Sequence, residues 1–371
     1  MVSGLDRALE TLKGMHLGSK RLGLVTNAAS FKADFQSSKS YLYKNLPITD
    51  LFAPEHGLGS FIADGKEVSD QRDSETGLAV HSLYGSEGGK VDATACTNLD
   101  CLLFDIQDVG LRFYTYIATL KQLLELGKPL IVLDRPNPLG GLVVEGPILS
   151  DCYASFVGPS GLPVRYGLTI GELALWMQQQ YGFTGELTIV ELSGYKRSDL
   201  WMDNGRPWIM TSPALAHLQG VFLYAGFCLL EGTNLSEGRG TSAPFELFGA
   251  PFIDSYRLAA DVRKLGLEAI AFTPVSFIPG QSKYKGQLCH GLYAHILDYH
   301  LLRPFSVCLR VLSIIQKLYP NELTFNEHFR KLAGFEPEAL FAHQLSATLQ
   351  QAEGDEQTFM KQKRRFERYG N

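Results

Sequence analysis

Short apolar runs alternate with helical patterns over roughly the first 192 residues of this chain. Six runs have the length of β-strands: residues 21–26, 48–53, 80–84, 101–106, 130–133 and 187–190. Residues 115–127 lie between two of these runs and have a helical pattern, as do the first fifteen residues. Short buried strands that are separated by helices are typical of a parallel sheet with helices on both faces. The pattern therefore predicts an α/β fold.

Polar side chains follow these runs at the positions where the predicted strands end. They are Asn27, Glu55, His56, Asp108, Arg112, Asp134, Arg135 and Asn137. In open α/β sheets, ligands bind outside the carboxyl ends of the strands. We therefore expect these side chains to converge on one edge of the sheet, although they are far apart in the sequence.

The second half of the chain differs from the first in composition and in periodicity. Residues 193–251 are rich in Gly, Pro and aromatic residues and show little periodicity, which is typical of a long functional loop. Residues 269–272 suggest a further strand, and residues 305–318 and 322–367 have helical patterns. A total of 371 residues suits two domains. We place the boundary near residue 195, which gives domains of 1–195 and 196–371.

Composition excludes several classes of protein. Hydrophobic residues make up 45% and charged residues 20%, and 34 basic residues against 39 acidic ones leave a net charge of −5. An acidic chain is a poor non-specific binder of nucleic acid, because neutralising phosphates needs a basic face. No apolar run is long enough to span a membrane, and no apolar leader is visible, so we expect a cytoplasmic protein.

Standard cofactor and metal motifs are missing or misplaced. Residues 59–66 fail the Walker A spacing, and neither G-x-S-x-G nor H-E-x-x-H occurs. Residues 238–243 fit a degenerate dinucleotide fingerprint, but they follow a loop where that motif requires a strand. The six cysteines are scattered without C-x-x-C spacing. We therefore expect no cofactor and no metal ion.

Carboxylates beside Gly, Pro, Asn and Arg remain as candidates for chemistry. They are Glu55, Asp105, Asp108, Asp134, Glu145, Glu231 and Glu237. Paired carboxylates without a metal motif or an activated nucleophile suit glycoside hydrolysis, which needs a proton donor and stabilisation of a cationic sugar. The structural alternative is that Asp134–Arg135 and Glu237–Arg239 are ion pairs. Glu172 has a structural reading of its own, because Thr169 and Glu172 form a capping box before a helical run.

Seven motifs in order resemble one known family. They are PEHG (54–57), DIQDVG (105–110) with Arg112 and Tyr114, LDRPNP (133–138), VEGP (144–147), PVRYG (163–167), TIGE (169–172) and LEGTNLSEGRGT (230–241). Together they resemble the YbbC-like family, formerly a domain of unknown function, from about residue 5 to the C-terminus.

The resemblance implies a fold and an activity. It implies a Rossmann-like parallel-sheet catalytic domain, here 1–195, and a smaller α+β C-terminal domain, here 196–371, that closes the active-site cleft. The implied activity is that of an exo-β-N-acetylmuramidase, which releases terminal β-1,4-linked N-acetylmuramic acid from the non-reducing end of peptidoglycan fragments. A chain without a leader would act on imported muropeptide fragments during cell-wall recycling.

Catalytic roles are carried over from these motifs. Glu55 is the first choice for the general acid/base, since burial at a strand end can raise the pKa of a carboxyl group. Glu145 is the second choice for a catalytic carboxylate, and Glu231 and Glu237 compete with it. If the acetamido group of the substrate replaces an enzyme nucleophile, Asp108 is the candidate for the polarising acid.

The lactyl carboxylate of N-acetylmuramic acid calls for a cation, and Arg binds carboxylates bidentately. Arg112, Arg135, Arg165 and Arg239 are the candidates, and Asn27, His56, Tyr114, Asn137 and Asn234 complete the expected binding residues. The expected partner is a small saccharide rather than a nucleic acid or a membrane. Two alternatives stay open: a nucleotide-sugar or phosphate-transfer enzyme, and a carbohydrate-binding protein without turnover.

Overall fold

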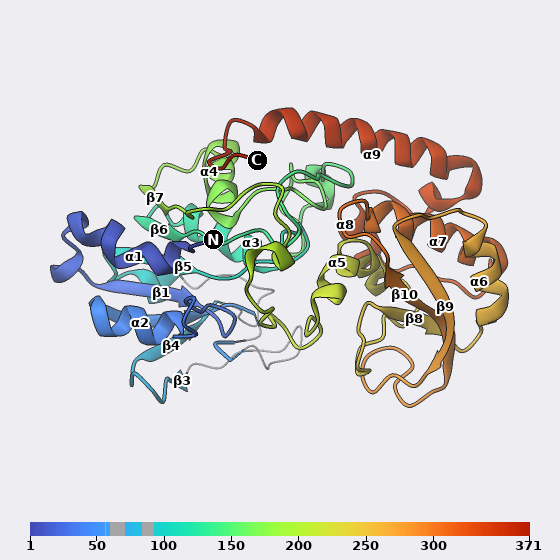
Figure 1. The fold of residues 1–371 in the computed structure, drawn as a ribbon, viewed down its shortest axis with the longest axis horizontal. Helices are drawn as coiled ribbons and strands as arrows, with labels where there is room; N and C mark the ends of the chain where they lie inside the picture. The colour runs from blue at the N-terminus through green and yellow to red at the C-terminus, as the bar shows by residue number, and fades with distance from the viewer. Residues whose placement is uncertain (56, 60–70, 84–92) are drawn as a thin grey trace. The chain divides into compact units, whose positions relative to one another are not determined.

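The computed structural model describes residues 1–55, 57–59, 71–83 and 93–371, and it divides into two compact units (Figure 1). Unit 1 comprises residues 1–143, 166–213 and 360–371. Unit 2 comprises residues 144–165 and 214–359. Each unit is therefore assembled from segments that are distant in the sequence.

Unit 1 is built on a seven-stranded sheet. Its strands are β1 (Leu22–Thr26), β2 (Ile48–Ala53), β3 (Gln71–Arg72), β4 (Ala79–Ser82), β5 (Cys101–Asp105), β6 (Leu130–Leu133) and β7 (Leu187–Val190). The order is β3-β4-β2-β1-β5-β6-β7, and only the edge strand β3 is antiparallel to its neighbour. The parallel strands follow the doubly wound order, in which the direction of winding reverses between β1 and β5. The predicted Rossmann-like α/β class is confirmed.

Among the described residues of unit 1, four α-helices flank this sheet: α1 (Gly4–Leu12), α2 (Ser38–Asn45), α3 (Tyr116–Glu125) and α4 (Ile170–Tyr181). The predicted capping box is confirmed, because the Thr169 hydroxyl accepts the amide of Glu172 and the Glu172 side chain accepts the amide of Thr169. Helix α4 ends at Gly182, whose φ of 70° suits a left-handed cap.

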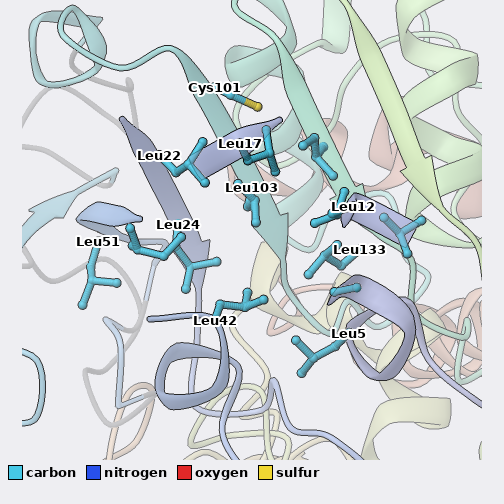
Figure 2. Close-up of a cluster of buried hydrophobic side chains, with 14 of the residues drawn as sticks. Leu5, Leu12, Leu17, Leu22, Leu24, Leu42, Leu51, Cys101, Leu103 and Leu133 are labelled. Atoms are coloured by element: carbon cyan, nitrogen blue, oxygen red, sulfur yellow. The ribbon is translucent and has the colours of Figure 1, made fainter. Parts of the chain in front are cut away.

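One cluster of buried apolar side chains lies between helices α1 and α2 and the strands of the sheet, chiefly β1, β2, β5 and β6 (Figure 2). Leu5 from α1, Leu24 from β1 and Leu103 from β5 are all fully buried there. All five residues of β1 and of β5 are buried. Strands that are buried on both faces appear in the sequence as continuous apolar runs, which explains why the sequence pattern located them.

Unit 2 combines a small sheet with five helices. The helices are α5 (Leu218–Phe227), α6 (Ser255–Arg263), α7 (Pro304–Leu318), α8 (Glu327–Ala333) and α9 (Ala342–Lys363), of which the last four residues of α9 belong to unit 1. Strands β8 (Leu247–Ala250), β9 (Ile270–Phe277) and β10 (Cys289–Ile296) form an antiparallel sheet in the order β8-β10-β9. This smaller α+β part agrees with the fold class that the sequence predicted.

Two sequence expectations were wrong in unit 2. The helix expected over 322–367 is interrupted at Gly334, whose φ is 84°, and at Pro337. The aperiodic stretch 193–251 contains α5 and β8. Helix α5 is apolar and is buried from Gly220 to Phe227, so it has no polar face to produce a helical period.

Within residues 1–55, 57–59, 71–83 and 93–371, no helix combines the length and the hydropathy that crossing a membrane requires.

Candidate active site

The carboxyl ends of the central strands bring several predicted site residues to one edge of the sheet. Asn27 follows β1, Glu55 lies two residues after β2, and Asp108 lies three residues after β5. Strand β1 lies between β2 and β5, so the strands that lead to Glu55 and Asp108 are two strand spacings apart, roughly 10 Å. Glu55 and Asp108 are both buried. The predicted His56 lies outside the described residues.

Asp108 is held by one carboxylate oxygen. Its Oδ2 accepts the amide of Gly110 at 2.7 Å and a short hydrogen bond from the Tyr166 hydroxyl, whereas Oδ1 has no hydrogen-bond partner. Burial raises the pKa of Asp108 to about 6, even though both donors favour its ionised form. Asp108 can therefore hold a proton near neutral pH, and Oδ1 is the oxygen available to carry it.

Other buried polar atoms without partners gather at the ends of β1 and β5. They include Thr26 Oγ1, Asn27 Nδ2 and Gln107 Oε1. The Asn27 Oδ1 accepts the amide of Ala29 at 3.1 Å, which turns Nδ2 away as an unused donor. Buried polar groups are normally satisfied, so this cluster marks the winding reversal as a place for a polar ligand. Gln107 was not among the predicted site residues, although it lies inside the DIQDVG motif.

Arg135 forms an ion pair with Asp105, not with Asp134 as the sequence had suggested. Its Nε lies 2.6 Å from Asp105 Oδ1 and its Nη2 lies 2.9 Å from Oδ2. Asp134 instead accepts the Gly171 amide at 2.7 Å and the Thr169 hydroxyl at 2.8 Å, which ties it to the start of α4. Burial raises the pKa of Asp134 to about 7.

Three further predicted residues of unit 1 are buried beside these loops. Asn137 donates to the carbonyl of Leu168 at 2.9 Å and accepts the amide of Leu139 at 2.9 Å, so its side chain links two loops. The hydroxyl of Tyr114 donates to Thr211 Oγ1 at 2.7 Å. Arg112 is completely buried.

The predicted residues of the 230–241 motif form a charge network in unit 2. Glu231 is paired with Arg239 in a short contact, and Glu237 Oε1 lies 3.3 Å from Arg239 Nε, which confirms the expected Glu237–Arg239 pair. Lys283 Nζ lies 2.9 Å from Glu237 Oε2. Burial alone would raise the pKa of Glu231, but hydrogen bonds and charges from His328 and Arg239 lower it to about 2.

Asn234 and the dinucleotide-like stretch have local structural roles. Asn234 exchanges side-chain hydrogen bonds with the carbonyl of Glu322 and the amide of Thr324. Residues 238–243 lie between a short 3-10 helix, Cys228–Gly232, and strand β8. They are therefore not the strand-to-helix turn that binds a dinucleotide.

Glu145 and Arg165 belong to unit 2 and pair through their backbones, with amide-to-carbonyl distances of 3.0 and 2.9 Å. The Glu145 Oε1 accepts the amide of Ser306, in the first turn of α7, at 3.1 Å, and its Oε2 has no hydrogen-bond partner. Burial raises the pKa of Glu145 to about 7, against the opposing charge of Arg165. Glu145 therefore acts as a distant N-terminal cap of α7.

One further buried carboxylate was not predicted from the sequence. Glu246 in unit 2 is buried, and its Oε2 accepts hydrogen bonds from Gln219 at 2.7 Å and from the Tyr293 hydroxyl at 3.1 Å. It follows Phe245, a buried residue with a φ of 64°. Neither feature leaves a periodic signal in the sequence.

In the part of the chain that the structure describes, no group of three or more His, Cys, Asp or Glu side chains is arranged to hold a metal ion.

Comparison with known proteins gives concordant matches over both units. Family models described as the N-terminal and C-terminal parts of the exo-β-N-acetylmuramidase NamZ match residues 22–219 and 222–369. Over 340 residues the chain is 42% identical to the peptidoglycan β-N-acetylmuramidase NamZ of Bacillus subtilis (strain 168), covering 90% of this chain and 82% of that protein.

Two solved structures of DUF1343 family proteins from Bacteroides fragilis NCTC 9343 are also similar. One has a TM-score of 0.87 at 29% identity and covers 99% of this chain and 98% of that chain. The other has a TM-score of 0.76 at 26% identity and covers 100% of this chain and 99% of that chain. The similarity therefore extends over the whole chain in both sequence and fold.

Proposed function

Because the chain belongs to the exo-β-N-acetylmuramidase NamZ family, as its motifs predicted, we propose that it releases terminal β-1,4-linked N-acetylmuramic acid from the non-reducing end of peptidoglycan fragments. The observation that carries this proposal is the buried Asp108 at the winding reversal, with one oxygen held by two donors and the other unpartnered. Glycoside hydrolysis needs such a carboxyl group, protonated near neutral pH, together with a second carboxylate.

The geometry favours a division of roles between Asp108 and Glu55. Asp108, whose pKa burial raises to about 6, is assigned as the proton donor to the leaving oxygen. Glu55, expected from its motif as the acid/base, is assigned as the second carboxylate, which activates water or stabilises the cationic sugar. Strand β1 separates the two strands that precede them, so the two carboxyl groups stand on different loops at the same edge of the sheet.

Substrate choice tests the proposed activity directly. A chromogenic aryl β-N-acetylmuramide and the matching β-N-acetylglucosaminide should be incubated with the wild-type protein and with Glu55→Gln. We expect release from the muramide only, and loss of that release in a variant that retains the wild-type melting temperature. No release from either glycoside by a folded wild-type protein would rule out the activity.

Recognition of the lactyl carboxylate still rests on the four arginines of the motifs. Arg112, Arg135 and Arg165 are buried, and Arg239 has the most exposed side chain, at 19%. Replacing each in turn by Gln and measuring the ratio of muramide to glucosaminide turnover identifies the one that contacts the carboxylate. An unchanged ratio in all four variants would refute an arginine contact.

The finer expectations about partner and compartment belong to the same proposal. We expect a muropeptide-derived saccharide as substrate, no binding to nucleic acid or membranes, and action in the cytoplasm. Fractionating cells that express the full-length native gene product tests the compartment. Recovery of the protein outside the cytoplasm would contradict that part of the proposal while leaving the activity intact.

A further inference from the structure

A small pocket opens in unit 1 beside the winding reversal of the sheet. Its volume is about 90 Å³, and its apolar walls include Phe31, Trp201 and Ile209. Gln107 and Arg135, from the loops after β5 and β6, supply polar lining. A cavity of about 150 Å³ accommodates a benzene ring, so this smaller space suits a substituent of a sugar rather than a sugar ring.

Two buried side chains of this pocket have unused hydrogen-bonding atoms. Gln107 Nε2 donates to the carbonyls of Asp108 at 2.8 Å and Pro136 at 3.0 Å, which fixes the orientation of its amide. The Gln107 Oε1 is therefore an acceptor without a partner, and the Trp201 Nε1 is a donor without a partner. Both side chains are more than nine-tenths buried. The pocket therefore offers a ligand one hydrogen-bond acceptor, Gln107 Oε1, and one donor, Trp201 Nε1.

The cations that line the pocket already have carboxylate partners. Arg135 holds Asp105, Arg206 Nη2 lies 2.6 Å from Asp6, and Lys32 Nζ lies 3.0 Å from Asp34. A ligand with a net negative charge would have to compete with these carboxylates. The two unpartnered atoms, Gln107 Oε1 and Trp201 Nε1, therefore favour a neutral ligand group that carries both an N–H donor and a carbonyl acceptor.

We propose that this pocket binds the acetamido group of the substrate sugar. The acetamido N–H would donate to Gln107 Oε1, its carbonyl oxygen would accept from Trp201 Nε1, and its methyl group would pack against Phe31 and Ile209. This inference rests on the proposed function, which supplies an N-acetylated sugar as substrate. It adds that Gln107 and Trp201 determine specificity for the N-acetyl group.

Binding measurements test the pocket without depending on turnover. Calorimetric titration should compare N-acetylmuramic acid with muramic acid, which has a free amine, on wild type, Trp201→Phe and the matched control Trp208→Phe. Losing one hydrogen bond should weaken the N-acetylated ligand roughly two- to tenfold in Trp201→Phe and leave the amine ligand unchanged. Trp208 packs edge-on against Trp201 at a ring distance of 5.1 Å but does not line the pocket, so Trp208→Phe should retain the preference.

A second variant protects the test against misfolding. Ile209→Trp adds bulk at the pocket wall and leaves Gln107 and Trp201 unsubstituted. It should lower affinity for the N-acetylated ligand more than tenfold while binding of the amine ligand stays within twofold. Melting temperatures of both variants should match the wild type within a few degrees. If both fold and neither changes the preference for the N-acetyl group, the proposal is overturned.

The amide bond that joins a peptide stem to the lactyl group also carries an N–H donor and a carbonyl acceptor, so it could fill the same pocket. Comparing N-acetylmuramic acid with N-acetylmuramoyl-L-alanine distinguishes the acetamido group from this peptide amide. If Trp201→Phe erodes only the gain from the added alanine, the acetamido assignment is wrong. If the acetyl preference depends on Trp201 in a protein that does not cleave muramides, the pocket stands and the proposed activity fails. Cleavage of muramides with an acetyl preference that does not depend on Trp201 would overturn the pocket assignment and leave the proposed activity standing.

Discussion

Arg135 binds the carboxylate of Asp105 through two hydrogen bonds of 2.6 and 2.9 Å, and both side chains are at least 96% buried. The two residues come from the ends of neighbouring strands β5 and β6. Their pairing occupies the guanidinium fork, while Nη1 donates to the carbonyl of Phe31 at 3.3 Å. The pair therefore ties the loop after β1 to the two strands that follow it in the sheet.

Removing the arginine should destabilise the fold. Arg135→Met leaves Asp105 buried without its cation, and breaking a buried ion pair in this way costs about 3–5 kcal/mol. Urea unfolding should show this loss in the free energy of unfolding. The double variant Asp105→Leu/Arg135→Met should lose less than the single one, because no buried charge remains. A single variant within about 1 kcal/mol of the wild type would contradict the importance of the pair.

The pH dependence of activity should report Asp108. As a proton donor it must be protonated, so kcat/KM should fall as the pH rises through about 6, the pKa to which burial raises this group. Tyr166→Phe removes a donor that favours the carboxylate, so the pKa of Asp108 should rise further and the falling limb should move to higher pH. If the falling limb of the profile of kcat/KM against pH stays unchanged in Tyr166→Phe, that limb reports a group other than Asp108.

The leaving group separates the roles of Asp108 and Glu55. Asp108→Asn should lose roughly 10²–10⁴-fold on a disaccharide, whose sugar leaving group needs a proton. It should lose far less on an aryl muramide whose phenol leaves unprotonated. Glu55→Gln should lose activity on both substrates. The opposite pattern, in which Glu55→Gln spares the aryl substrate, would exchange the two assignments and agree with the first choice made from the motif.

The strands and their polar ends could be predicted because both leave local signals. Strand β5 is buried on both faces and therefore reads as an unbroken apolar run that ends at Asp105. Parallel strands bring their carboxyl ends to one edge, so Asn27 and Asp108 could be placed together without knowing the strand order. The capping box of Thr169 and Glu172 was recognisable for the same reason, since it lies within four residues.

Features that depend on distant partners could not be predicted. The choice of Asp105 over Asp134 by Arg135 follows from side-chain directions on adjacent strands, which residue spacing does not encode. The assignment of Gln107 and Trp201 as ligand-binding residues depends on which of their atoms remain without hydrogen-bond partners after folding. Helix α5 could not be predicted from the sequence pattern, because a helix that is buried on all sides has no amphipathic period.

Stability should depend on pH through Glu145. Burial raises its pKa from 4.5 to about 7, so the folded protein binds this proton more tightly than the unfolded chain does. Below pH 4.5 the carboxyl is protonated in both states and carries no cost. As the pH rises towards 7 the unfolded chain releases the proton first, and above 7 the fold bears a cost on the order of 3 kcal/mol.

Glu145→Gln removes this titration while keeping an oxygen that can accept the amide of Ser306. Relative to the wild type, the variant should therefore be more stable at about pH 8 than at about pH 4. Urea unfolding at both pH values measures the difference, and Glu338→Gln, on a separate short helix of unit 2, provides a matched control. Equal shifts at the two pH values would show that Glu145 does not titrate differently in the folded and unfolded states. A cost confined to high pH would identify burial of the charged carboxyl group as its source, because the amide of Ser306 and the charge of Arg165 both favour the ionised form.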